Sequence, residues 1–281
     1  MSRKNTVVLS LSILAGILSM GILVYQQLPD AISDFSPTNG KAEDVAEDLV
    51  LFYSQKPLWR NCEGSNTQAR CGEIEVPLDW SKPSGGSIKI ALAINPAIDP
   101  KNAPYLLMNP GGPGSSGRDW VTEYIDSTGT ERLRSEYNIV GFDPRGVGKS
   151  TAVKCLPAKD LEKYLYEPSP YEYLSDQDLE YSRTQIKKFA DACLENTGDL
   201  LGHVDTESAA RDMDVIRAVL GSKQLNYLGF SYGTLLGATY AVLYPEKVGR
   251  FVLDGVVDPT TSAEEDSLNQ LKGFKSAMEA Y

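Results

Sequence analysis

The chain has 281 residues, of which 42% are hydrophobic and 23% are charged, a composition typical of a globular protein with one substantial core. Its formal net charge of −11 argues against nucleic acid as a partner, because phosphate binding needs clustered cations, and Lys and Arg cluster here only in pairs such as Lys187-Lys188. The sequence contains no internal repeats and no low-complexity tracts.

The first segment predicts export. Arg3 and Lys4 precede a 20-residue apolar run without a charge, Thr6–Tyr25. Such a run is long enough to cross a bilayer as a helix or to form the core of a signal peptide, and the cations before it favour a cytoplasmic N-terminus. We therefore expect residues 1–25 to be a signal peptide or a signal-anchor helix, with the body secreted or held at the membrane. Residues 26–58, acidic and containing prolines, are predicted to be a linker with one short helix.

Four cysteines fit an exported protein, because an even number can pair completely in an oxidising compartment. Four cysteines allow three disulfide pairings. No two of these cysteines are spaced as Cys-x-x-Cys, which a structural zinc site would require. We expect no metal and no cofactor. The cysteines are Cys62, Cys71, Cys155 and Cys193.

The next segments read as strands. Residues 72–78 and 88–94 predict two strands joined by a turn at 83–86. A third predicted strand, Tyr105–Asn109, runs into a glycine-rich loop at 110–117. This loop contains Gly-x-Gly-x-x-Gly, which raises the alternative of dinucleotide binding. That alternative is disfavoured by Pro113 inside the turn and by the position of the motif a third of the way along the chain.

A second phosphate-binding alternative follows the predicted strand Tyr137–Phe142. The segment after it ends in Gly148-Lys149-Ser150, like a P-loop, but Asp143 stands where the first glycine is required, and its carboxylate would repel a phosphate. We interpret residues 143–146 instead as a sharp turn in which Asp143 and Arg145 fasten neighbouring loops.

Residues 151–205 interrupt the alternation of strands and helices with an acidic, tyrosine-rich helical insertion. Ser175 and Asp178 form a capping box, and a helix follows at Thr206–Leu220 with Gly221 as its stop. The spacing of four residues in the insertion predicts one inner apolar face, made of Leu179, Ile186, Phe189 and Cys193.

A candidate catalytic site lies at Gly-Phe-Ser-Tyr-Gly, residues 229–233, between an apolar stretch at 225–228 and a helix-like run at 234–244. This is the setting of a nucleophile elbow, in which a serine sits on a strained strand-to-helix turn between glycines. Ser231 is the candidate nucleophile, and the backbone N–H groups of Tyr232 and Gly112 are the candidate oxyanion hole. The alternative interpretation is a glycine-rich strand-to-helix connection without catalytic function.

Four signatures together resemble secreted bacterial tripeptidyl aminopeptidases, which are α/β-hydrolase serine exopeptidases related to proline iminopeptidases. They are found at residues 109–114, 141–148, 229–234 and 253–259, and the similarity runs from about Trp59 to Tyr281. The resemblance implies a mostly parallel sheet with flanking helices, and a peptide substrate with a free N-terminus. It also implies neighbour pairing of the cysteines, with Cys62 joined to Cys71 and Cys155 to Cys193, and a lid that begins at 260–281.

The chain departs from this family in its catalytic base. In α/β-hydrolases an acid and then a histidine follow the nucleophile, but the single histidine, His203, precedes Ser231. We interpret His203 as a loop residue, and Asp254 and Asp258 as turn and loop residues. The sequence therefore predicts an incomplete α/β-hydrolase domain at 59–281, lacking the last strands. The alternative is an inactive hydrolase fold that acts as a binding or scaffold protein.

Overall fold

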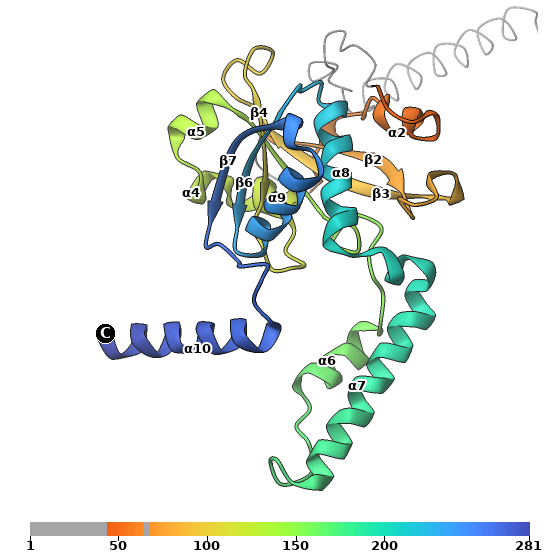
Figure 1. Cartoon of the computed structure of the whole chain (residues 1–281), viewed down its shortest axis with the longest axis vertical. Coiled ribbons are helices and arrows are strands. Elements are labelled where there is room, and N and C mark those ends of the chain that lie inside the picture. The colour runs from red at the N-terminus through yellow and green to blue at the C-terminus, as the bar shows by residue number, and fades with distance from the viewer. Residues whose placement is uncertain (1–43, 64–67) are drawn as a thin grey trace, which may run out of the picture.

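The computed structural model describes residues 44–63 and 68–281, and its body is a twisted sheet covered by helices (Figure 1). The predicted apolar segment Thr6–Tyr25 lies outside the described residues. Among those residues no helix combines the length and the apolar character needed to cross a bilayer.

The sheet has seven strands in the order β1-β2-β3-β5-β4-β6-β7. The first three strands pair antiparallel, and β3 also pairs antiparallel with β5, whereas β5, β4, β6 and β7 run parallel. The carboxyl ends of β4, β5, β6 and β7 therefore meet at one edge of the sheet, which we call the carboxyl edge. The strands are β1 (Arg60–Asn61), β2 (Arg70–Pro77), β3 (Ser87–Asn95), β4 (Tyr105–Asn109), β5 (Asn138–Phe142), β6 (Leu225–Phe230) and β7 (Val248–Asp254).

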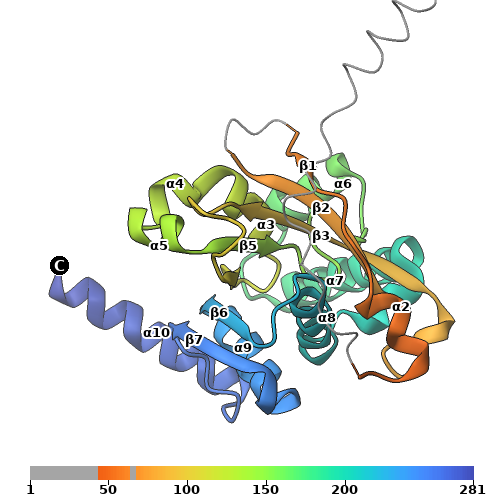
Figure 2. The same ribbon diagram turned by 90° about the horizontal axis from the view of Figure 1, so that it is seen from above.

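Helices cover both faces of the sheet (Figure 2). Successive residues of the central strands point to opposite faces, so Leu107 packs in the larger core with α8 and α9, whereas Met108 packs in a smaller core with Val121 and Ile125. Both cores consist mainly of apolar side chains, which explains why the central strands read as continuous apolar runs. The helices of the body are α3 (Gly117–Asp119), the π-helical turn η4 (Trp120–Tyr124), α4 (Ile125–Thr128), α5 (Glu131–Glu136), α8 (Thr206–Val219), α9 (Tyr232–Leu243) and the 3₁₀ turns η3 (Pro83–Gly85) and η6 (Pro245–Lys247).

The folded domain begins earlier than residue 59. The 3₁₀ turn η2 (Glu47–Leu49) and the helix α2 (Val50–Tyr53) lie against the body, and the Tyr53 side chain is buried in the larger core. Its hydroxyl donates to Asp214 Oδ2 at 2.9 Å. Residues 44–58, which we assigned to the linker, therefore belong at least in part to the domain. Sequence periodicity missed them because only one turn of helix contributes a deeply buried side chain.

The insertion forms a separate projection, which we call the arm: α6 (Ala158–Tyr166), α7 (Asp176–Thr197) and the 3₁₀ turn η5 (Gly198–His203). Its two long helices extend away from the body (Figure 1). Ser175 caps α7 by accepting from the N–H of Asp178, as predicted, and the Asp178 carboxylate accepts from the N–H of Leu174. The predicted inner face is only partly correct, since Cys193 is buried but Leu179 and Ile186 are exposed. Within the part of the chain that the structure describes, no third helix covers them.

The cysteines are joined as Cys62–Cys71 and Cys155–Cys193. This is the neighbour pairing that the family resemblance implied. The second bond lies at the root of the arm, where Thr197 Oγ1 also accepts from Lys154 N at 2.9 Å and donates to Lys154 O at 2.8 Å. The two ends of the arm are thus fastened to each other where they leave the body.

The final helix, α10 (Ala263–Ala280), lies outside the body beyond β7 (Figure 1). Ser262 caps it by accepting from Glu265 N. Its large apolar side chains are exposed, namely Leu268, Leu271, Phe274 and Met278.

Candidate active site at the carboxyl edge

Ser231 sits on the turn between β6 and α9 with φ 52° and ψ −121°, a region that L-residues other than glycine rarely occupy. Its N–H donates to the carbonyl oxygen of Asp254 at 2.8 Å, so the end of β7 holds the strained turn in place. The side chain is exposed at the carboxyl edge, directly before the first turn of a helix. This is the geometry that nucleophile elbows share.

Both glycines of the pentapeptide are required by close contacts. A Cβ at Gly229 would lie 2.5 Å from the carbonyl oxygen of Gly233, and a Cβ at Gly233 would lie 2.7 Å from the carbonyl oxygen of Asn109. Real Cβ atoms do not approach backbone oxygen so closely. The sharp turn at Ser231 is therefore possible only because its second neighbours on either side have no side chain.

The glycine-rich loop after β4 lies directly against the elbow. A Cβ at Gly111 would meet the carbonyl oxygen of Phe230 at 2.5 Å and the Cβ of Ser231 at 3.1 Å. Gly111 and Gly112 have φ values of 100° and 109°, and the N–H of Gly111 donates to Asn109 Oδ1 at 2.9 Å. The structure thus brings the two predicted elements of an oxyanion hole, the loop and the elbow, into contact.

Asn109, the last residue of β4, is a part of this site that sequence analysis did not single out. It is fully buried, its Oδ1 holds the loop, and its Nδ2 is buried without a hydrogen-bond partner among the described residues. Its position immediately before Pro-Gly-Gly was the available signal, because an Asn side chain readily accepts from backbone two residues further on.

Asp143, at the end of β5, fixes the far end of the glycine-rich loop. Its Oδ1 accepts from Ser116 Oγ at 2.5 Å and from Arg118 N at 3.2 Å, and its Oδ2 accepts from Lys149 N at 2.8 Å. Ser116 is also the N-cap of α3. The buried carboxylate therefore occupies the amide groups that a phosphate would need, which explains physically why this segment is not a P-loop.

Arg145 fastens the loops beside Asp143, as the sequence predicted. Its guanidinium forms a bidentate pair with Asp212, with Nε–Oδ2 at 2.8 Å and Nη2–Oδ1 at 2.7 Å, and both side chains are fully buried. The remaining donors bind three carbonyl oxygens, those of Pro77, Leu78 and His203. Burial raises the pKa of Asp212 to about 6, so the pair is still ionic at neutral pH.

The structure gives the other polar candidates structural roles. His203 ends η5, and its carbonyl oxygen accepts from Arg145 Nη1 at 2.9 Å. Asp258 Oδ1 accepts from the Oγ1 and N of Thr260, and the hydroxyl hydrogen bond lowers the pKa of Asp258. Asp254 contributes its carbonyl to the elbow, as described above. These contacts agree with their interpretation as turn and loop residues.

Three hydroxyl groups lie beside the elbow, those of Thr206, Tyr232 and Thr234. Thr206 Oγ1, at the start of α8, lies 3.0 Å from the Tyr232 hydroxyl, and Thr234 Oγ1 donates to the carbonyl oxygen of Ser231 at 2.7 Å while accepting from Val257 N at 2.9 Å. Tyr232 therefore links the elbow to the exit of the arm. Within residues 44–63 and 68–281, no group of His, Cys, Asp and Glu side chains is arranged to hold a metal ion.

The model of the alpha/beta hydrolase fold family matches residues 104–281, which include β4, the glycine-rich loop and the elbow. The chain belongs to this family. The match agrees with the mixed seven-stranded sheet and with its parallel central strands.

Three curated relatives show the nearer relationships, each 38% identical to this chain. Serine protease Hip1 of Mycobacterium tuberculosis matches over 231 residues, 79% of this chain and 44% of that protein. Tripeptidyl aminopeptidase of Streptomyces lividans matches over 209 residues, 72% and 38% of the two chains. Carboxylesterase B of M. tuberculosis matches over 215 residues, 76% and 41%. The chain thus spans less than half the length of these relatives, and the predicted resemblance to tripeptidyl aminopeptidases is confirmed.

Proposed function

We propose that this protein, in its complete form, is a serine hydrolase that releases short peptides from free N-termini by acyl transfer through Ser231. The observation that carries the proposal is the strained elbow at Ser231, held directly against the Gly111 backbone. Strain at a non-glycine residue costs on the order of 1–3 kcal/mol and persists where a function requires it.

In the proposed reaction Ser231 Oγ attacks the carbonyl carbon of the scissile bond and gives up its proton to a general base. The carbonyl oxygen becomes an oxyanion, which the N–H groups of Tyr232 and Gly112 stabilise, at about 3 kcal/mol for each such donor. The amine of the downstream peptide leaves with a proton, and an acyl-enzyme remains on Oγ. Water then attacks this ester and releases the short peptide with a new carboxylate.

The general base is not His203 in this proposal. His203 is held through its backbone carbonyl on the Arg145 side of the edge, and in α/β-hydrolases the acid and the histidine follow the serine in the chain. The 281 residues contain no histidine after Ser231. The proposal therefore covers the nucleophile and the oxyanion hole, and it assigns no residue of this sequence as the general base.

The substrate class rests on the relatives. Two of the three are named for peptide hydrolysis, one as a tripeptidyl aminopeptidase, and the third is named an esterase. Esters and amides pass through the same acyl-enzyme, so the chemistry at Ser231 does not distinguish them. Peptides with a free N-terminus are the proposed substrates, and small esters are the second candidate.

A fluorophosphonate probe on the natural protein, purified from the cells that produce it, tests the nucleophile. We expect labelling of the wild type, loss of labelling in Ser231→Ala, and retention of labelling in the control Ser262→Ala, which removes an exposed hydroxyl that caps α10. Tripeptidyl arylamides should then be cleaved, and their N-acetylated counterparts should not. Labelling that survives Ser231→Ala would disprove the nucleophile, whereas equal cleavage of acetylated peptides or a preference for aryl esters would disprove the exopeptidase.

The second candidate is a binding or scaffold protein with an inactive hydrolase fold. The observation that favours it is that the single histidine of this sequence, His203, binds Arg145 Nη1 through its backbone carbonyl. A natural protein that is folded by circular dichroism, binds peptides and reacts with no serine-directed probe would establish this candidate.

We also propose that the protein is exported, and that the apolar segment Thr6–Tyr25 holds it at the membrane or directs its secretion. Two disulfides and no free cysteine among the described residues support an oxidising compartment. Intact cells treated with an impermeant protease should lose the protein, and carbonate washing should distinguish an anchored form from a released one. Protection in intact cells, with exposure only after lysis, would contradict export.

A further inference from the structure

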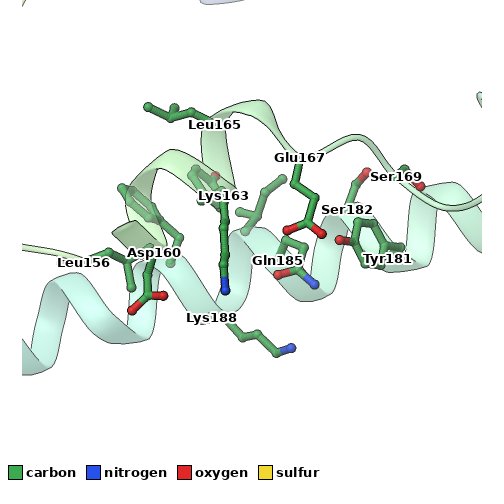
Figure 3. Close-up of a pocket in the computed structure, with 13 residues that line it drawn as sticks. Leu156, Asp160, Lys163, Leu165, Glu167, Ser169, Tyr181, Ser182, Gln185 and Lys188 are labelled. Atoms are coloured by element: carbon green, nitrogen blue, oxygen red, sulfur yellow. The ribbon is translucent and has the colours of Figure 1, made fainter. Parts of the chain in front are cut away.

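The arm has the properties of an interaction surface. It projects beyond the body, and its two helices share little core of their own apart from the stacked rings of Tyr164 and Phe189, whose centroids are 4.4 Å apart (Figure 1). Between the helices lies an open groove of about 560 Å³, with Leu156 at one end and Tyr181 at the other (Figure 3). The apolar floor of this groove is not covered by any other described element.

The tip of the arm, residues 166–180, runs from the end of α6 to the start of α7 and carries exposed aromatic rings and negative charge. Tyr166 is 79% exposed and Tyr173 is 84% exposed, and Tyr171 and Leu174 lie beside them in the sequence with their side chains also exposed. Residues 164–182 contain no Lys or Arg. Over the same stretch four carboxylates face solvent, those of Glu167, Glu172, Asp176 and Glu180.

The arm leaves the body beside the candidate nucleophile. It follows the carboxyl end of β5, which is parallel to β4 and β6, so its root and Ser231 lie at the same edge of the sheet. At the exit of the arm, Thr206 Oγ1 lies 3.0 Å from the Tyr232 hydroxyl. The disulfide Cys155–Cys193 and the Lys154–Thr197 hydrogen bonds fix the root, so the arm has a defined starting point beside the elbow.

We propose that the arm binds the downstream part of a polypeptide substrate, and that its tip selects segments containing basic and large apolar side chains. The choice of occupant follows from charge complementarity: exposed tyrosine rings and carboxylates together attract Lys and Arg, whose stems pack on rings while their cations meet carboxylates. This inference rests on the proposed function, because it names the substrate class that reaches Ser231.

The dimensions of the arm predict a dependence on peptide length. The 22 residues of α7 correspond to a length of about 33 Å. An extended peptide covers about 3.3 Å per residue, so about ten residues after the scissile bond are needed to reach the tip. Shorter peptides enter the site without this contact, and longer basic peptides gain it.

Binding is tested first, apart from catalysis. The probe is a fluorescent, N-acetylated 16-residue peptide of repeated Gly-Lys-Leu-Ser, added to the natural protein carrying Ser231→Ala and followed by anisotropy. We expect binding that weakens at least tenfold in a tip variant, Glu167→Gln with Glu172→Gln, Tyr171→Ala and Tyr173→Ala. A control on the body, Glu123→Gln with Tyr124→Ala in η4, removes one exposed carboxylate and one exposed ring and should bind as the parent does. A Gly-Glu-Leu-Ser peptide should not bind.

Kinetics supply the second test. With free-N-terminus peptides of increasing length, KM should fall severalfold once about ten residues follow the scissile bond, while kcat stays constant, and the tip variant should lose this fall. Equal binding to the tip variant and its parent, or a length-independent KM, would overturn the proposal. Loss of self-association or of binding to phosphatidylcholine vesicles in the tip variant, with peptide binding unchanged, would assign the surface to a second copy or to a membrane and would also overturn it.

The two proposals can fail separately. If the natural protein does not react with the fluorophosphonate and cleaves no peptide, the proposed function fails, but tip-dependent binding of the acetylated peptide is still measurable. If peptides are cleaved and the acetylated peptide shows no tip-dependent binding, the proposal for the arm fails and the proposed function stands.

Discussion

The carboxyl edge and the arm are adjacent in space, but they use polar groups in opposite ways. At the edge, the Asp143 carboxylate accepts three hydrogen bonds and every guanidinium nitrogen of the buried Arg145 has a hydrogen-bond partner. On the arm, charged residues form solvent-exposed pairs such as Lys187–Asp191. The edge therefore holds one backbone geometry, because unsatisfied buried polar groups would be costly, whereas the charged residues of the arm face solvent and leave its surface available for contacts.

The largest expected loss of stability comes from adding a side chain where two backbone segments touch at the edge. A Cβ in Gly141→Ala would overlap the carbonyl oxygen of Gly117, which begins the helix after the glycine-rich loop. Because backbone must move, we expect a loss of about 3 kcal/mol or more in the free energy of unfolding, measured by urea titration. The matched control is Gly202→Ala at the arm's exit, where nothing lies within 4 Å of the added Cβ and no loss is expected. Similar stability of the two variants would contradict the comparison.

The next effect concerns charge. Asp212→Asn leaves the Arg145 guanidinium buried without its carboxylate, which should cost about 3 kcal/mol in the free energy of unfolding. Asp191→Asn removes the partner of Lys187 on the arm, where both side chains are exposed, and should leave stability unchanged within error. Thermal and urea unfolding of both variants measure the contrast. A stable Asp212→Asn protein would show that the edge tolerates an unpaired buried cation.

Removing the disulfide at the root should lower the local stability of the arm and leave that of the sheet unchanged. In protein carrying Cys155→Ser and Cys193→Ser, we expect the opening free energy of the amides in α7 to fall by about 2–3 kcal/mol, because the arm loses a covalent closure of its ends. Amides of β4 and β6 should exchange as in the wild type, since the sheet does not depend on the arm for its core. Hydrogen exchange followed by mass spectrometry distinguishes the two. Equal acceleration in the sheet would show that the arm and the body unfold together.

The pH dependence of stability should report the lowered pKa of Asp214, a buried carboxylate of α8. Asp214 accepts from Tyr53, Tyr240, Arg217 and Lys247, and although burial alone would raise its pKa, the Arg217 hydrogen bond and the nearby cations lower the pKa below the ordinary 3.8.

A depressed folded-state pKa contributes stability that is present above the unfolded value and is lost as the pH falls through the folded one. The difference in unfolding free energy between the wild type and Asp214→Asn should therefore be constant from pH 7 to about pH 5 and shrink below about pH 4. Urea titrations from pH 3 to pH 7 measure it. A difference that grows on acidification would contradict the lowered pKa.

The smallest effect is expected at His203. Its contact at the edge is made by the backbone carbonyl, which His203→Ala keeps. The free energy of unfolding should therefore stay close to that of the wild type, and the turnover of peptide substrates by the natural protein should change by no more than a few-fold. Loss of a general base would instead cost several orders of magnitude. Such a collapse, with the far-ultraviolet spectrum intact, would place the base before the nucleophile and overturn our interpretation of the site.

Most strands and helices of the body could be predicted from local sequence patterns. Continuous apolar runs predicted the strands at 105–109, 137–142 and 225–228. Serine and aspartate predicted the start of α7, and both bounds of α8 were predicted within one or two residues. These features are local: a strand buried on both faces and a capped helix leave their pattern within ten or twenty residues. The elbow at Ser231 was also visible, because its geometry depends on two nearby glycines.

The contacts between residues far apart in the chain emerge only in the folded structure. It shows that Asp143 holds the far end of the glycine-rich loop, that Arg145 pairs with Asp212, and that Tyr53 enters the core from the segment assigned to a linker. It also showed that the apolar face of α7 is left uncovered, although its periodicity predicted burial. Periodicity reports that a face can be buried, whereas its partner depends on the path of the whole chain, and hydrogen bonds between residues dozens of positions apart leave no local pattern.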